Sequence, residues 1–235
     1  MKITVVYDNE AAKAGLTADW GFSALIEIEK RAPILFDTGA DGSILLQNMA
    51  KLGIDPKNIG ITVISHDHYD HTGGLRDFLA ANRETEVYLP ASFRGNLPGR
   101  KVTSVTEPAE VAEGVFSTGK LKGIEQSLAI KTEKGILVMV GCSHPGVGEI
   151  IDAAAKFGQV YGIIGGFHGF RDFNRLQGLP LIVPCHCTQH KQEILDMFPE
   201  QCVRCGAGLV LEQQAAVFTP PTLWRFQENS DAEFQ

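Results

Sequence analysis

Three histidines and two aspartates lie within the six residues 66–71, which read HDHYDH. Side chains of these types bind divalent metal ions and transfer protons near neutral pH. The stretch follows a β-branched run over residues 61–64 and precedes paired glycines and a helix-like segment over residues 75–81. This pattern predicts a strand, a turn that carries metal ligands, and the start of a helix.

The spacing within this turn suits a site for two metal ions. In an extended segment His66 and His68 point to the same side, so both imidazoles can reach one ion. Asp70 and His71 lie beyond the bend, where they can serve a neighbouring ion. The alternative is a polar loop without a metal, but this combination of residues in this register rarely arises by chance.

Three further histidines each follow an apolar run that is typical of a strand. A lone histidine is more often solvated than a ligand. However, the carboxyl ends of strands on one edge of a fold converge, so these three are expected near the 66–71 turn. His190, at a predicted helix start, is expected on the surface. The three are His144 after residues 135–140, His168 after 160–164, and His186 after 181–183.

An early hairpin brings a further carboxylate. Residues 22–29 and 33–36 are predicted to form antiparallel strands, and the second ends at Asp37. Asp37 either delivers a carboxylate to the sheet edge or only forms a turn. The other predicted strands cover residues 2–7, 86–89, 101–106, 114–118, 127–132 and 208–212, and the predicted helices cover 43–52, 75–82, 148–157 and 191–198.

Composition indicates one large domain. The chain has 235 residues, of which 44% are hydrophobic and 21% charged, enough to bury a full core. We expect this domain to cover residues 1–218 and a C-terminal tail to cover residues 219–235. The net charge of −7, without a cluster of Lys or Arg, argues against nucleic-acid binding. An anionic small-molecule substrate remains compatible, because bound metal ions would supply local positive charge.

The N-terminus and the hydropathy predict a cytoplasmic protein without a membrane span, since no signal peptide or long apolar run is present. The tail contains Trp224 and Phe226 after two prolines, which indicates either a frayed end or docking on the domain or a partner. A homodimer contact through these aromatics is a hypothesis.

The five cysteines are an odd number in a chain without an export signal, which favours thiols or metal ligands over disulfides. Four of them form a Cys-x-Cys pair and a Cys-x-x-Cys pair. They either bind a structural zinc ion or are separate buried thiols, because Cys-x-Cys is tighter than usual zinc spacing. These four are Cys185, Cys187, Cys202 and Cys205.

Taken together, these motifs resemble those of the metallo-β-lactamase-fold hydrolases over about residues 1–212. Within that superfamily they look like the branch named after the archaeal 7,8-dihydropterin-6-ylmethyl-4-(β-D-ribofuranosyl)aminobenzene 5′-phosphate synthase. The motifs are LFDTG at 35–39, SHDHYDHTGGL at 65–75, GCSH at 141–144, GGFH at 165–168 and HCT at 186–188.

The resemblance implies an α/β fold, the four-layer αβ/βα sandwich with metals at one edge. It also implies one or two Zn²⁺ ions, with Mn²⁺, Fe²⁺ or Mg²⁺ as alternatives at the second position. Asp70 would also shuttle a proton, and Asp37 would orient a histidine from outside the ligand set. The implied ligands are His66, His68 and His144 for one ion, and Asp70, His71 and His186 for the other.

Two departures from the family pattern stand out. The aspartate that normally bridges the ions is missing, and His168 is the nearest candidate for its place. A neutral imidazole replaces an anion poorly, so His168 either binds metal or hydrogen-bonds a substrate phosphate, with a purely structural role as the third alternative. The stretch between the helix after residue 75 and the GCSH motif is also short, which leaves the pterin substrate of the branch open.

Three functions follow from this pattern. The first is a metal-dependent hydrolase in which hydroxide, generated at the metal, attacks a phosphoester or a similar anionic small molecule. The second is a transferase that couples a dihydropterin methyl diphosphate to an aryl amine, as in methanopterin biosynthesis. The third is a non-catalytic metal-binding or redox-sensing module, which only the late cysteines support.

Overall fold

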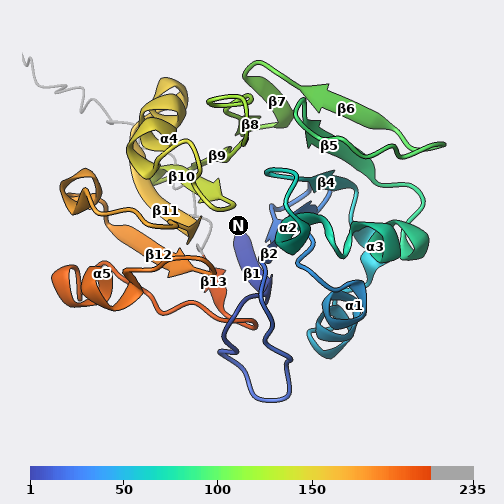
Figure 1. Ribbon diagram of the computed structural model, residues 1–235, viewed down its shortest axis with the longest axis horizontal. Coiled ribbons are helices and arrows are strands. Elements are labelled where there is room, and N and C mark those ends of the chain that lie inside the picture. The colour runs from blue at the N-terminus through green and yellow to red at the C-terminus, as the bar shows by residue number, and fades with distance from the viewer. Residues whose placement is uncertain (213–235) are drawn as a thin grey trace, which may run out of the picture.

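The computed structural model describes residues 1–212 of the chain (Figure 1). The predicted tail over residues 219–235, with Trp224 and Phe226, lies outside the described residues, as does the predicted domain end at residue 218. Within residues 1–212, no helix is both long and apolar enough to cross a membrane.

The first sheet has seven strands, and its N-terminal part is antiparallel. The last four strands of the spatial order given below, from residue 34 to residue 105, run parallel to one another. Their carboxyl ends therefore lie along the same edge of the sheet. In spatial order the strands are β13 (Val210–Glu212), β1 (Lys2–Tyr7), β2 (Ser23–Glu27), β3 (Ile34–Phe36), β4 (Ile61–Val63), β5 (Glu86–Pro90) and β6 (Val102–Val105).

The second sheet has six strands, of which three are parallel neighbours at one side. In spatial order they are β12 (Leu181–Cys185), β11 (Val160–Gly166), β10 (Gly135–Val140), β9 (Leu128–Thr132), β8 (Val115–Ser117) and β7 (Ala109–Ala112). Strand β7 was not expected, because its sequence AEVA contains only one residue with a strong preference for strands.

Helices cover the outer faces of both sheets. In Figure 1, α1 to α3 lie on the side of the first sheet and α4 and α5 on the side of the second. The α-helices are α1 (Gly42–Lys51), α2 (Tyr69–Thr72), α3 (Leu75–Ala81), α4 (Val147–Ala154) and α5 (Lys191–Met197). Three short 3₁₀ turns cover Pro56–Asn58, Ala155–Phe157 and Phe173–Leu176, and the second of these is the end of the helix expected over residues 148–157.

Three buried clusters hold these layers together. One lies between the two sheets, one between the first sheet and α1 and α3, and one between the second sheet and α4. Adjacent residues of one strand belong to different clusters because side chains alternate across a strand. Examples are Phe36 and Met139 between the sheets, Leu35 and Phe78 beneath α1 and α3, and Val138 and Ile150 beneath α4. The predicted αβ/βα sandwich is therefore confirmed.

Candidate metal centre

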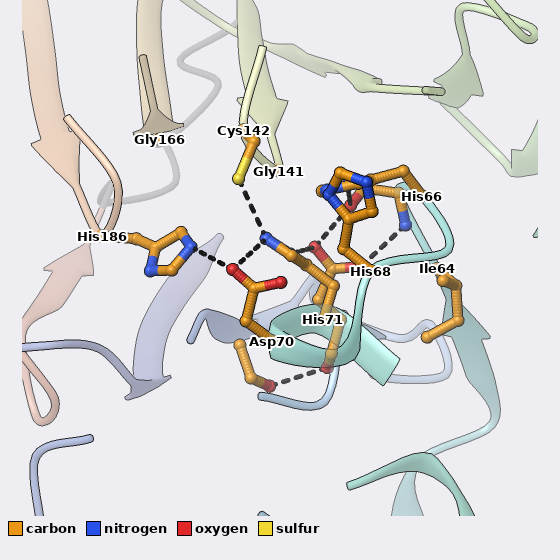
Figure 2. A network of polar contacts seen from close by, with 12 residues as sticks. Ile64, His66, His68, Asp70, His71, Gly141, Cys142, Gly166 and His186 are labelled. Carbon is orange, nitrogen blue, oxygen red and sulfur yellow. Dashed lines mark hydrogen bonds and ion pairs between the residues drawn. The ribbon is translucent and has the colours of Figure 1, made fainter. Parts of the chain in front are cut away.

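The ends of four strands, two from each sheet, meet the helix α2 at one edge of the sandwich (Figure 2). Helix α2 is a single turn that begins directly after His68 and carries two of the predicted ligands. The structure thus brings together chemical groups that are up to 149 positions apart in the sequence, if Asp37 and His186 are compared. The side chains are Asp37 after β3, His66 after β4, Asp70 and His71 on α2, Cys142 and His144 after β10, and His186 after β12.

His71 is held by the carboxylate of Asp37. The Asp37 Oδ2 atom lies 2.7 Å from Nδ1 of His71, and both side chains are fully buried. Because a carboxylate accepts hydrogen bonds, Nδ1 carries the proton and donates it. The Nε2 atom of His71 is then directed towards Asp70 and Cys142, at 3.9 Å and 3.1 Å.

His66 is oriented by the same carboxylate through a serine. The Ser65 hydroxyl donates to Asp37 Oδ2 at 2.7 Å, so it accepts from Nδ1 of His66 at 2.9 Å. Its Nε2 atom is buried and has no hydrogen-bond partner among the described residues, and the same holds for Nε2 of His144. Buried polar atoms are almost always satisfied, so two such nitrogens in one place indicate a ligand position.

His186 faces Asp70 in an arrangement that favours a cation. Nδ1 of His186 lies 2.8 Å from Oδ1 of Asn9, and that oxygen also accepts the Gly21 N–H, so Nδ1 carries the ring proton. Nε2 therefore presents its lone pair to Oδ2 of Asp70 at 3.1 Å. Two electron-rich atoms this close require either a proton or a metal ion between them. Trp20 donates its indole N–H to the same Asp70 oxygen at 3.0 Å.

The pKa values follow from burial and from these partners. Burial, followed by the neighbouring His71, lowers the pKa of His66, and burial together with His68 lowers the pKa of His144 to about 4. Burial alone would lower the pKa of His71, but the charges of Asp37 and Asp70 raise it. The centre therefore combines neutral imidazoles at His66 and His144 with carboxylates, donors that suit a divalent cation.

The ligand atoms form two groups that share one sulfur. Within each group, all ligand atoms lie within 4.8 Å of one another. The predicted ligand side chains lie close together as expected, except that His68 belongs to neither group. Its exposed ring lies 4.6 Å from the ring of His66 and 4.8 Å from that of His144, centroid to centroid. The groups are Asp70, His71, Cys142 and His186, and His66, Cys142 and His144.

Glu125 is a positioning residue that the sequence analysis missed. Its Oε1 atom accepts the backbone N–H groups of Gly141, Cys142 and Ser143 at 3.0–3.1 Å, and Oε2 accepts that of His144 at 2.8 Å. The residue is fully buried, which raises its pKa, while the N–H groups of His144 and Ser143 act in the opposite direction. No motif marks this glutamate, because it lies in a connection more than 50 residues from the histidine turn.

His168 does not take the place of the missing aspartate. Its side chain is exposed, and its ring lies 5.2 Å from that of His144, in neither group of ligand atoms. It lines a pocket of about 280 Å³ together with His144 and residues of α4 and the loop after β11. Of the two predicted roles, this placement fits contact with a substrate better than metal binding.

The four late cysteines do not form one cluster, which agrees with separate buried thiols, the second of the two alternatives for these residues. Cys187 lies 3.2 Å from Cys142, sulfur to sulfur. Cys185 and Cys205 instead gather with Asp8, and burial raises the pKa of both thiols. The physical reason is that alternation, which would place both residues on one face, stops at the strand end: Cys185 still belongs to β12 and lies in the core, whereas Cys187 follows His186, whose φ is 45°. The Cys202 thiol donates to the Ile194 carbonyl, at 3.6 Å, and lies in none of the ligand groups.

Backbone strain concentrates at the centre. Six non-glycine residues among the described ones have a positive φ, and four of these lie at the metal-site edge. Such conformations are costly for L-residues and occur where the surrounding structure fixes them for function. The four are Asp37, Ser143, His168 and His186, with φ of 57°, 60°, 46° and 45°.

A pocket of about 330 Å³ opens beside the histidines. Its lining includes His66 and His68 together with Arg94 and Ile124. Arg94 is exposed, and its backbone N–H donates to Asp67 at 2.9 Å, which anchors the loop to the histidine turn. A larger pocket of about 420 Å³ behind α3, lined by Arg76 among others, contains none of the histidines.

Comparison with known proteins adds sequence relatives. The sequence model of the metallo-beta-lactamase superfamily matches residues 17–130. A Methanocaldococcus jannaschii protein named 7,8-dihydropterin-6-methyl-4-(beta-D-ribofuranosyl)-aminobenzene-5'-phosphate synthase is 28% identical, over 89% of this chain and 95% of its own length. That alignment spans 280 residues, more than the 235 of this chain, so the relative carries segments that this chain lacks.

Two solved structures are also similar. Tm1679, described as a metal-dependent hydrolase of the beta-lactamase superfamily, has a TM-score of 0.73 at 28% identity, covering 92% of this chain and 100% of that one. The metallo-beta-lactamase fold protein YhfI from Bacillus subtilis has a TM-score of 0.63 at 13% identity, covering 90% of this chain and 99% of that one. The second likeness concerns the fold alone.

Proposed function

Because the chain belongs to the metallo-β-lactamase superfamily, we propose that it is a metal-dependent hydrolase of an anionic small molecule, such as a phosphoester. The observation that carries this proposal is the pair of adjacent ligand groups with unpartnered, buried Nε2 atoms on His66 and His144. A structural role would leave these nitrogens unsatisfied at a cost of about 1–3 kcal/mol each.

The donors fit divalent transition metals, and zinc best. Imidazole and thiol groups are ligands that zinc prefers, and zinc sites for catalysis keep one open position. When bound, an ion of this kind acts as a Lewis acid and makes hydroxide available near neutral pH. The residues that would hold the ions are His66, His68 and His144 for one, and Asp70, His71 and His186 for the other.

The protein's own residues would bind and orient the substrate. Arg94 places a positive charge at the mouth of the pocket that His66 and His68 line, where it can pair with a phosphate or carboxylate. His168, beside His144, can donate a hydrogen bond to the same anion from the other side. Asp70, at the floor of the centre, can accept a proton from the attacking water and return it to the leaving group.

The test is turnover by the full-length protein after loading with Zn²⁺ or Mn²⁺. The panel contains a phosphomonoester, a phosphodiester, a thioester and a lactone. We expect turnover of at least one of these substrates, and a loss of about 10²–10⁴-fold in Asp70→Asn. Asp55→Asn, an exposed aspartate at the start of a 3₁₀ turn, is the matched control. Absence of turnover with every substrate, or turnover that survives both chelation and Asp70→Asn, would exclude the hydrolase.

A transferase is the second candidate, and the M. jannaschii synthase relative supports it. In that reaction the ions would stabilise the diphosphate leaving group of a dihydropterin methyl diphosphate. Mass spectrometry of the protein incubated with this diphosphate and an aryl amine distinguishes the two. A coupled pterin product supports the transferase, whereas release of the pterin alcohol without coupling supports the hydrolase.

A further inference from the structure

The geometry points to Cys142 as the metal ligand that both positions share, in place of the aspartate that the sequence lacks. This inference rests on the proposed metal-dependent function and adds a sulfur donor to its site. The Cys142 sulfur is the only member common to the two groups of ligand atoms at this edge, and the third group within residues 1–212, Asp8, Cys185 and Cys205, does not contain it. In Figure 2 the Cys142 side chain points towards the ring of His71.

Two independent observations distinguish Cys142 from an ordinary core thiol. Buried free cysteines are common and usually inert. Here, however, the orphaned Nε2 atoms of His66 and His144 lie in one group with this sulfur, although the two residues come from different sheets. On the other side, Nε2 of His71 lies only 3.1 Å from the sulfur. The sulfur therefore faces nitrogen donors on both sides.

The backbone on both sides of Cys142 is held in place by specific contacts. The Cys142 N–H donates to Glu125 at 3.1 Å. The preceding Gly141 packs so tightly that a Cβ there would come within 2.2 Å of the Ser65 hydroxyl. The following Ser143 has a φ of 60° and donates its hydroxyl to the Gly166 carbonyl at 2.7 Å. Three contacts of this kind on the backbone next to one thiol are typical of a positioned ligand.

A thiolate has the charge and the lone pairs that a ligand shared by two metal ions requires. It carries one negative charge, as the missing carboxylate would, and its sulfur has lone pairs for two ions. Binding would release the thiol proton to solvent. Since sulfur is a soft donor, the centre should select Zn²⁺ or Fe²⁺ over Mg²⁺, which prefers oxygen ligands. This narrows the range of metals that the histidines and Asp70 alone would allow.

The experiment is cobalt substitution of the full-length, metal-free protein. With two equivalents of Co²⁺, we expect a thiolate-to-cobalt charge-transfer band in the near ultraviolet. The band should disappear in Cys142→Ser, and affinity for the second ion should fall more than about 100-fold, because even residues behind a ligand cost 10–100-fold. Cys142→Asp should restore two ions per chain without the band, since it supplies a carboxylate at the same place.

Matched controls use the neighbouring thiols. Cys187→Ser removes a buried sulfur only 3.2 Å away and should keep both the band and the metal content. Cys205→Ser tests the separate cluster with Asp8 and should likewise keep the band. Loss of the band in either control, with retention in Cys142→Ser, would overturn the assignment.

A measurement on the unaltered protein covers the case in which Cys142→Ser does not fold. X-ray absorption of the zinc-loaded wild type should contain a sulfur shell at about 2.3 Å. Two bound ions with only nitrogen and oxygen neighbours would overturn the role of Cys142 and leave the proposed hydrolase intact. A wild-type protein that binds no ion at all would overturn both.

Discussion

The carboxylate of Asp37 lies 2.7 Å from Nδ1 of His71, with neither side chain exposed to solvent. The same carboxylate also accepts the N–H and the hydroxyl of Ser65, each at 2.7 Å. One buried anion therefore sets the orientation of His71 directly and of His66 through Ser65. This relationship couples the first sheet to both ligand groups, because Asp37 ends β3 while Ser65 and His66 follow β4.

Asp37→Asn should weaken metal binding by about 10–100-fold, because the histidines lose the acceptor that fixes their protonated nitrogen. The metal-free protein should also lose about 3 kcal/mol of unfolding free energy, since a buried charged pair is broken. Competition with a chromophoric chelator measures the first effect, and urea unfolding measures the second. Asp55→Asn should change neither quantity, and unchanged values in Asp37→Asn would refute the positioning role.

Glu125→Gln should destabilise the protein by about 1–3 kcal/mol, because the amide nitrogen cannot accept the His144 N–H that Oε2 accepts now. The released His144 should also lower metal affinity at the position of His66. Glu110→Gln is the matched control, since Glu110 is exposed and accepts a single backbone N–H from Gly114 at 3.0 Å. Equal effects of the two substitutions in urea unfolding and metal titration would argue against the positioning role of Glu125.

Arg94→Ala should raise KM for an anionic substrate about 10-fold with little change in kcat, because a hydrogen bond to a charged group contributes about 1.5–3 kcal/mol. The anchoring contact to Asp67 uses the Arg94 backbone, so it survives the substitution. Arg76→Ala, in the pocket without histidines, should leave KM unchanged. Steady-state kinetics, with whichever substrate of the panel is turned over, measures KM and kcat for both variants. A fall in kcat alone in Arg94→Ala would show that Arg94 does not contact the substrate.

Trp20 should report metal binding by fluorescence. Its indole donates to Asp70 at 3.0 Å, and its ring lies 4.9 Å from the ring of His186, centroid to centroid. Co²⁺ should therefore strongly quench the emission of Trp224→Phe, in which Trp20 is the one remaining tryptophan. Unquenched emission of this variant after Co²⁺ loading would place the ion away from Asp70.

The fold and the gathering of histidines could be predicted because both depend on local signals. Strand patterns that end in Asp37, His66 and His186 are visible in the sequence, and parallel strand ends converge by geometry. The ligand roles of these residues remain predictions, since only their positions are now known. The short helix α2 was not expected, because four residues are too few for a helical period.

The features of the site that the sequence did not predict depend on contacts between distant segments of the chain. Nothing local marks Glu125, Asn9 or Trp20, because each acts on a residue 16 or more positions away. The pairing of Cys142 with Cys187, rather than a cluster of late cysteines, also arises only when β10 and β12 flank β11. Sequence spacing left a zinc site and separate thiols open, and only the packing at the strand end separates Cys185 in the core from Cys187 beside Cys142.

The most direct test of the central claim is the metal content per chain, measured by plasma mass spectrometry after purification without chelator. The wild type should carry about two transition-metal ions, and His66→Ala combined with His186→Ala, one ligand from each group, should carry none. A wild type without metal, or ions that persist in the double variant, would contradict a catalytic metal centre at this edge. Persistent ions would instead favour the cysteines and the non-catalytic metal-binding module.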